Sequence, residues 1–149
     1  MKNCLRSSYP VLLLSILLAQ NAAAATISSP SGKIQFTVDS SDGLAYQVEA
    51  FGKPVLLPSS MSLSATGLPA LEKQVKIVEV ATRQNDTTWK PVVAGRRSTI
   101  RDHYNELTCR IESANDKGLV VLLQVRVFDD GVAFRYDVPK QGPRQDFQS

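Results

Sequence analysis

Cysteine and histidine are scarce in this 149-residue sequence, which contains two cysteines, Cys4 and Cys109, and one histidine, His103. Cys4 precedes an apolar run typical of a secretory leader, so processing would leave Cys109 alone and exclude an intrachain disulfide. His103 has no second histidine or cysteine nearby, so a histidine- or thiolate-ligated metal site is not expected. We expect Cys109 to be a small buried hydrophobe within a strand and not a catalytic thiol.

Catalytic motifs are missing as well. The sequence has no G-x-S-x-G elbow, no P-loop and no dinucleotide-binding glycine pattern, and we predict no catalytic residue and no metal ligand in it. Glycoside hydrolysis needs two carboxyl groups at a set separation. Five acids are available, but a turn or a solvated strand face explains each of them: Glu106, Glu112, Asp129, Asp130 and Asp137.

An excess of charge is also absent once the leader is set aside. Residues 1–25 combine the basic Lys2 and Arg6 with the apolar run Val11–Ala19, which is too short to span a bilayer. This signal peptide carries two of the seventeen Lys and Arg residues and none of the fourteen acids, so the remainder has a net charge of +1. A near-neutral chain does not favour a nucleic-acid or membrane partner. The signal predicts a periplasmic or secreted protein.

The sequence after the leader has strand patterns nearly throughout. Apolar and polar residues alternate over 33–39, turn chemistry follows at 40–43, and 98–112 predicts one long strand with Leu107 facing inward. There is no convincing amphipathic helix and no internal repeat. Eight or nine short strands with regular turn signals indicate an all-β fold, an antiparallel β-sandwich, in one domain over residues 26–149.

Three segments interrupt this pattern. Residues 66–73 contain Gly67 and Pro69 and are predicted as a loop, and 83–88 (RQNDTT) is predicted as a turn. Residues 140–149 lack apolar periodicity. A sandwich without a further strand there would leave sheet edges unpaired, which natural domains normally avoid, so we expect the front part of a larger protein.

The stretch QVRVFDDGVAFRYD contains the strongest local signal, an Asp130-Gly131 step between two alternating apolar runs. A two-residue turn there places Val127 opposite Phe134 and Val125 opposite Tyr136. The same register sets Arg126 against Arg135, although like charges directly across a strand pair are destabilising. A three-residue loop would mix polar and apolar faces, so the alternation favours the two-residue turn and the arginine pair.

The face that carries the two arginines is semi-polar. Phe128, Ala133, Gln124 and Asp137 are predicted to share it. Asp137 lies diagonally within reach of either arginine in this register and can offset their repulsion. Our hypothesis is that Arg126 and Arg135 meet acidic or carbonyl groups of another part of the protein, or a sugar.

Trp89 is a second candidate for a binding residue. A flat apolar ring suits the face of a pyranose, so Trp89 could serve as a sugar-stacking platform, but a lone tryptophan in a β-sandwich is more often part of the core. The basic run Arg96–Arg101 could bind an anion. A charged bend on a solvated surface is the simpler interpretation.

Three segments of the chain together resemble one enzyme family, glycoside hydrolase family 97. The first, ATISSPSGKIQFTVDSSDGLAYQVEAFGKPVLLPSSMSL, is similar to the opening of that family. The second, WKPVVAGRRSTIRDHYNELTCRI, is similar to its W-x-P-V and His-Tyr-Asn-Glu stretch. The third and most specific is VRVFDDGVAFRYDVP, which is close to its R-V-F-[ND]-D-G-[VI]-A-F-R-Y hairpin. One departure is Val93-Ala94-Gly95-Arg96, where the family has an aromatic residue, glycine and an acid.

The resemblance implies a much longer exported bacterial enzyme acting on α-glucosides or α-galactosides. Such enzymes have an N-terminal β-super-sandwich of the galactose-mutarotase-like type, a central (β/α)8 barrel and a C-terminal all-β domain. Their catalytic carboxylates and calcium-binding glutamates lie mainly in the barrel and in a later part of the first domain. None of these positions has a counterpart here, so we expect no cofactor in this chain and calcium only in the full-length family.

Three hypotheses follow. In the first, the chain is an incomplete N-terminal domain that supports the barrel and one wall of the substrate pocket, without hydrolysing anything alone. In the second, it is a stand-alone periplasmic carbohydrate-binding module. In the third, it is a periplasmic interaction protein whose open sheet edge receives a partner strand.

Overall fold

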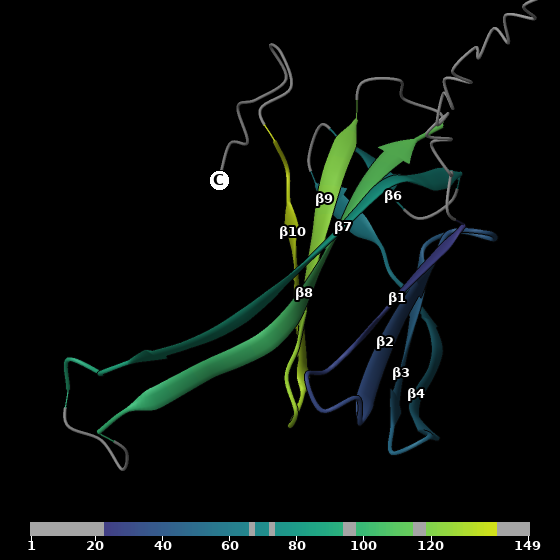
Figure 1. Cartoon of the computed structure of the whole chain (residues 1–149). Helices are drawn as coiled ribbons and strands as arrows, with labels where there is room; N and C mark the ends of the chain where they lie inside the picture. The colour runs from purple at the N-terminus through teal and green to yellow at the C-terminus, as the bar shows by residue number, and fades with distance from the viewer. Residues whose placement is uncertain (1–22, 66–67, 72–73, 94–97, 115–118, 140–149) are drawn as a thin grey trace, which may run out of the picture.

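The computed structural model describes residues 23–65, 68–71, 74–93, 98–114 and 119–139, and all regular secondary structure in these residues is strand. Two four-stranded antiparallel sheets face each other (Figure 1), which confirms the predicted all-β sandwich. No helix in the described part of the chain is long and apolar enough to cross a membrane. Most of the predicted leader and the segment 140–149 lie outside the described residues.

Sheet 1 is an antiparallel meander in the order β1-β2-β3-β4. Its strands are β1 (Ala24–Ser28), β2 (Ile34–Asp39), β3 (Ala45–Ala50) and β4 (Lys53–Ser60). The predicted turn at Ser40–Gly43 is confirmed, and a further turn that contains Gly52 joins β3 to β4. Both glycines have a left-handed backbone, with φ of 96° at Gly43 and 72° at Gly52, a conformation that other residues adopt only at a cost.

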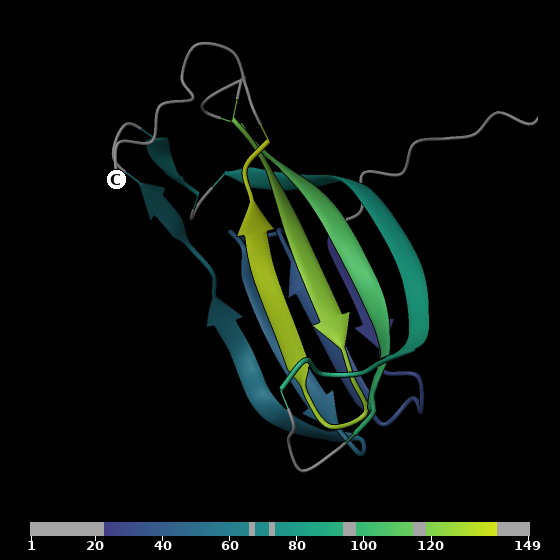
Figure 2. The ribbon, with the colours of Figure 1, turned by 90° about the vertical axis from the view of Figure 1, so that its left-hand side faces the viewer.

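Sheet 2 has the order β10-β9-β8-β7 and lies in front of sheet 1 in Figure 2. Its strands are β7 (Val75–Trp89), β8 (Ile100–Ser113), β9 (Val120–Val127) and β10 (Val132–Asp137). Along the chain, between β4 and β7, the strands β5 (Leu63–Ala65) and β6 (Leu68–Leu71) form a small hairpin. The prediction of a loop over 66–73 was therefore wrong for Leu68–Leu71.

The core lies between the two sheets, and buried side chains recur with a period of two in β2, in β9 and in the inner part of β8. The side chains with at most 1% exposure are Phe36, Val38, Ile77, Leu107, Cys109, Ile111, Val121, Leu123, Val125 and Val127. Burying a side chain of this size contributes about 1.5–3 kcal/mol. The prediction for Cys109 is confirmed, and its burial raises the pKa of the thiol to about 12, which leaves it unreactive at neutral pH.

Polar contacts also join the two sheets. The side-chain amide of Asn105 in β8 donates to the Ser28 carbonyl oxygen in β1 over 2.8 Å. At the same end, the backbone N–H of Ser31 donates to Asp129 Oδ1 in the β9–β10 loop, also over 2.8 Å. These bonds have defined partners and directions, so they fix how the sheets are placed in a way that apolar contact alone cannot.

Two strands leave the sandwich as a long ribbon. The pairing of β9 with β8 reaches Val127 opposite Asn105, whereas β7 and β8 continue together as far as Trp89 opposite Ile100. We call residues 85–89 and 100–104 the arm, and Figure 1 shows it projecting from the sandwich. The predicted turn at 83–88 was wrong, because these residues pair continuously with β8.

Candidate functional site

The β9–β10 hairpin has a different register from the predicted one. Its loop contains four residues, Phe128–Gly131, and the Phe128 N–H donates to the Gly131 carbonyl oxygen over 2.8 Å. Arg126 consequently lies opposite Ala133, and Arg135 lies opposite Gln124. The predicted two-residue turn and the directly opposed arginines were therefore wrong. The shift is of two residues, so the two arginines still share one face, as diagonal neighbours.

Glu106 of β8 lies between two arginines on the outer face of sheet 2. It is opposite Arg83 of β7 and Arg126 of β9. Arg83 Nε is 2.7 Å from Glu106 Oε1, and Arg126 Nε is 2.7 Å from Glu106 Oε2. Glu106 is only 6% exposed, so the interpretation of this residue as part of a solvated face was wrong.

The two arginines determine the charge of Glu106. Burial by itself raises the pKa of the carboxyl group, but hydrogen bonds from Arg83 and Arg126 outweigh it, and the pKa of Glu106 lies below its ordinary value. Glu106 is therefore ionised at neutral pH, with both carboxylate oxygens engaged. Such a group is suited to holding three strands together and is poorly suited to proton transfer.

Two aromatic rings complete this cluster. The guanidinium carbon of Arg126 lies 4.5 Å from the centroid of the Tyr104 ring, within the range of a cation–π interaction. The Phe128 ring packs against the Tyr104 ring, with a distance of 5.2 Å between the ring centroids. Tyr104 is buried although it is on the outer face, because Arg126 and Phe128 cover it. This packing orders the first residue of the loop.

Asp129 connects the same loop to sheet 1. Hydrogen bonds from the hydroxyl group and the backbone N–H of Ser31 hold the pKa of Asp129 below its ordinary value. Asp129 does lie in the predicted loop, but its carboxylate bridges two segments 98 residues apart. The three segments that carry the family resemblance thus meet in one place, which we call the motif cluster: Ser28, Ser31, Tyr104, Asn105, Glu106, Arg126, Phe128 and Asp129.

Arg135 lies at the edge of the motif cluster. Its Nε donates to Gln124 Oε1 over 2.9 Å, and its side chain is otherwise exposed. With Arg126 and Ala133, these residues line a shallow hollow of about 170 Å³ on the outer face of the hairpin. The acid that Arg126 contacts is Glu106, whereas Asp137 lies opposite Leu122. Arg135 is thus the more available of the two arginines.

Trp89 lies far from Arg126 and Arg135. Arg83 of β7 is aligned with Glu106 and Arg126 across the sheet, and Trp89 is six residues farther along β7, a distance of about 20 Å in an extended strand. Trp89 is 52% exposed near the end of the arm, so the expectation of a core tryptophan was wrong. Val92 and Val93 beside it are also exposed.

The basic run and the family departure overlap in the sequence at Arg96. Arg101 makes a two-pronged ion pair with Asp86 across the arm, and both bonds measure 2.7 Å. The remaining arginines of the run, Arg96 and Arg97, lie outside the described residues, as does the departure at Ala94–Arg96. In the part of the chain that the structure describes, no three acidic, histidine or cysteine side chains gather closely enough to hold a metal ion.

Sequence reasoning missed how Tyr104, Glu106 and Asp129 act. Each makes its contact across strands or sheets that are about 20 to 100 residues apart in sequence, beyond the reach of a local pattern. The His-Tyr-Asn-Glu stretch contributed to the prediction only through its resemblance to a known family. Its juxtaposition of an aromatic residue, an amide and an acid in a buried strand was the available signal.

Known proteins are similar to this chain in sequence and in fold. The chain matches the family described as Glycosyl-hydrolase 97 N-terminal over residues 27–148. It is 27% identical over 128 residues to the retaining alpha-galactosidase of Bacteroides thetaiotaomicron, covering 84% of this chain and 18% of that protein.

Solved structures agree. A glycoside hydrolase family 97 enzyme from Pseudoalteromonas sp. strain K8, in complex with acarbose, superposes with a TM-score of 0.74 at 28% identity, over 80% of this chain and 18% of that one. A beta-arabinopyranosidase gives a TM-score of 0.73, also at 28% identity, over 79% of this chain and 18% of its own. The chain thus spans less than a fifth of the length of these relatives. It belongs to glycoside hydrolase family 97, in the region that forms the N-terminal β-sandwich of those enzymes.

Proposed function

We propose that this chain is a non-catalytic N-terminal domain of an exported α-glycoside hydrolase, which supports the catalytic barrel and one wall of the substrate pocket. The observation that carries the proposal is the motif cluster. The segments that resemble the family most closely are engaged in contacts within the sandwich, and Glu106 is held by two arginines. Their arrangement serves the architecture of the domain.

The substrate of the complete enzyme is proposed to be an α-glucoside or an α-galactoside. This class follows from the family and from the relative named retaining alpha-galactosidase. Hydrolysis would require the barrel, which accounts for the much greater length of the relatives. The barrel is the proposed partner of this domain, and calcium is expected only in the complete enzyme.

Hydrolysis by the chain alone is the first test. We expect the purified chain to release no nitrophenol from p-nitrophenyl α-glucoside or α-galactoside above a buffer control. The Pseudoalteromonas enzyme serves as the positive control. Turnover by the chain that survives further purification would contradict the non-catalytic role.

Docking to the barrel is tested in a chimera. The matching segment of the Pseudoalteromonas enzyme is replaced by residues 27–139 of this chain, and activity and thermal midpoint are measured. Arg135 is exposed, and its partner among the described residues is the neutral Gln124, so Arg135→Ala should lower the midpoint of the chimera more than that of the isolated chain. Arg110→Ala is the matched control, since Arg110 lies on the same sheet face but pairs with Glu112. Equal effects of Arg135→Ala in both proteins would contradict docking through this face.

Export is tested separately. Residues 1–25 fused to alkaline phosphatase should give phosphatase activity in the periplasm. Leu14→Arg interrupts the apolar run and should abolish that activity. Equal activity of the two fusions would contradict the proposed signal peptide.

The exposure of Trp89 favours a second candidate function, a stand-alone carbohydrate-binding module. An exposed tryptophan can stack on the apolar face of a pyranose ring. This candidate predicts binding to α-glucans or α-galactosides that Trp89→Ala weakens without changing the thermal midpoint. Calorimetry without heat for either class of sugar would remove it.

A further inference from the structure

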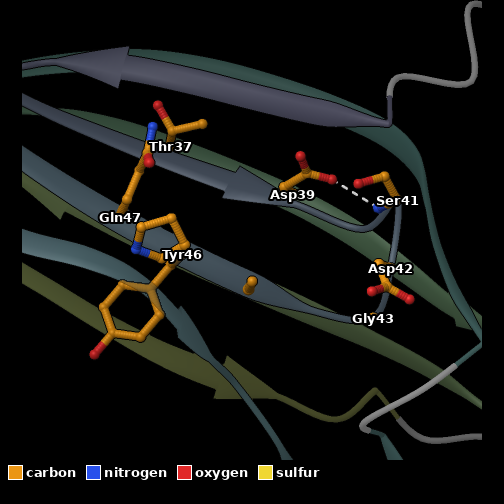
Figure 3. Close-up of a pocket in the computed structure, with 9 residues that line it drawn as sticks. Thr37, Asp39, Ser41, Asp42, Gly43, Tyr46 and Gln47 are labelled. Carbon is orange, nitrogen blue, oxygen red and sulfur yellow. Dashed lines mark hydrogen bonds between the residues drawn. The ribbon is translucent and has the colours of Figure 1, made fainter.

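A hollow of about 250 Å³ with a mixed polar and apolar lining lies on the outer face of sheet 1, remote in sequence from the arm and from the β9–β10 hairpin (Figure 3). Strands β2, β3 and β4 and the β2–β3 turn form its walls. The side chains that matter most are Thr37, Asp39, Asp42, Ala45, Gln47 and Pro58. The hollow is independent of the motif cluster.

Strand register explains why the hollow exists. Phe36 and Val38 face the core, so Thr37 and Asp39 of β2 point outward. Thr37 lies opposite Gln47, and Asp39 lies opposite Ala45. A small side chain beside a carboxylate leaves an open space between the strands, and Figure 3 shows Thr37 and Gln47 close together with the Tyr46 ring turned away from them.

The turn holds one wall of the hollow in place. Asp39 Oδ1 accepts a hydrogen bond from the Ser41 N–H over 2.6 Å, so the turn fixes the position of the carboxylate. Hydrogen bonds from the Ser41 hydroxyl and backbone keep the pKa of Asp39 below its ordinary value, so the carboxylate is an acceptor at neutral pH. The acceptor is thus ordered before any ligand arrives.

The lining selects a class of ligand. A carboxylate accepts hydrogen bonds, and a glutamine amide both donates and accepts. The Thr37 hydroxyl already shares a hydrogen bond of 2.9 Å with the Thr26 hydroxyl and keeps only its remaining capacity for a ligand. None of the nine residues that line the hollow is basic, and two are acidic, so an anion is disfavoured. Pro58 and Ala45 contribute apolar surface to the lining. This combination matches a neutral ring with hydroxyl groups at its rim and C–H groups on its face.

We propose that this hollow binds one neutral pyranose, either a monosaccharide or the end of a glycan chain. Its volume lies below the ~300 Å³ of typical pockets for drug-sized ligands, which fits a single ring. Affinity should be millimolar, because the hollow is open and a single ring offers few contacts. The inference does not depend on the proposed docking to a barrel, and it places sugar binding away from Trp89.

The test follows backbone amide signals of the ¹⁵N-labelled chain by NMR as glucose, galactose or maltose is added. We expect saturable shifts for residues 37–47 and 58–59 with at least one sugar. Gln47→Ala should weaken binding about tenfold, in keeping with the loss of more than one hydrogen bond. Ala45→Tyr, which fills the hollow, should abolish it.

Matched variants locate the site. Gln35→Ala removes an outward amide from the neighbouring strand β2, outside the hollow, and should leave the affinity unchanged. Shifts confined to the arm and lost in Trp89→Ala would overturn the proposal in favour of a platform at Trp89. The absence of saturable shifts with all three sugars would overturn it too, as would equal shifts on addition of Ca²⁺ alone. None of these outcomes bears on docking, which the chimera tests separately.

Discussion

The two halves of β8 have the same backbone structure but very different surroundings. Residues 105–112 are paired on both sides, by β7 and β9, and present Leu107 and Cys109 to the core. Residues 100–104 are paired only by β7, in the arm. A two-stranded ribbon is marginally stable alone, whereas three or more strands with a buried face are stable.

The difference shows that a strand pattern does not reveal how much a strand contributes to stability. In the inner half, apolar side chains are removed from water on the core side, and arginines shield Glu106 on the other. At the base of the arm Tyr104 still packs on Arg126 and Phe128. Farther out, the contacts include a surface ion pair between Asp86 and Arg101 and a hydrogen bond from the Asn85 side-chain amide to the Asp102 carbonyl oxygen. We therefore expect stability to reside in the inner half and local opening to occur in the arm.

The largest difference should come from apolar truncation in the two halves. Leu107→Ala removes a fully buried side chain and should lower the free energy of unfolding by about 2–5 kcal/mol. Trp89→Ala, in the arm, should change it by no more than about 0.5 kcal/mol, as at other exposed sites. Urea unfolding followed by circular dichroism measures both. A loss for Trp89→Ala as large as that for Leu107→Ala would show that the arm is part of the cooperative unit.

Removing the charge of Glu106 should have the next largest effect. Glu106→Gln leaves Arg83 and Arg126 without their shared acid, and we expect a loss of about 1–3 kcal/mol. The estimate is below that for a fully buried pair, because Arg83 is 62% and Arg126 39% exposed. Glu112→Gln is the control, since its pair with Arg110 is exposed and should contribute about 0–1 kcal/mol. Equal losses for the two variants would contradict the structural role of Glu106.

The same carboxylate predicts a pH dependence. The pKa of Glu106 is lower in the folded state than its ordinary value of 4.5, so ionisation stabilises the fold. This contribution is fully present above the ordinary pKa and is lost as the pH falls through the folded pKa. Unfolding should therefore become easier in acid, and the difference between the wild type and Glu106→Gln should shrink below pH 4.5. A constant difference across that range would contradict the pKa shift.

The sequence predicted the class of fold well and its long-range contacts poorly. The alternation of apolar and polar residues in β2 and in β8 is a local pattern, and the residues that it predicted to face inward, such as Phe36 and Leu107, are buried. The predicted hairpin register was wrong because two loop residues make tertiary contacts. Asp129 accepts a hydrogen bond from Ser31 and Phe128 packs on Tyr104, so the loop is longer than the Asp-Gly step alone. Tertiary contacts thus overrode a local turn preference.

The candidate site shows the same limit. Arg126 and Arg135 were singled out as a like-charged pair, and their placement on one face was correct. The acid that resolves the repulsion was sought on β10, at Asp137, and lies on β8, at Glu106. No local pattern specifies that β8 and β9 align Glu106 with Arg126, because that register depends on the whole sheet.

The smallest predicted effect concerns the arm itself. Asp86→Asn weakens the exposed ion pair with Arg101, and we expect no measurable change in the urea midpoint. Amide hydrogen exchange should instead become faster only in the outer part of the arm, at residues 86–89 and 100–103, because this part opens without the sandwich unfolding. Glu79→Gln provides the control, since it also removes one exposed acid from β7 but lies outside the arm. Faster exchange in β9, or an equal local effect from Glu79→Gln, would mean that the two halves of β8 do not open independently.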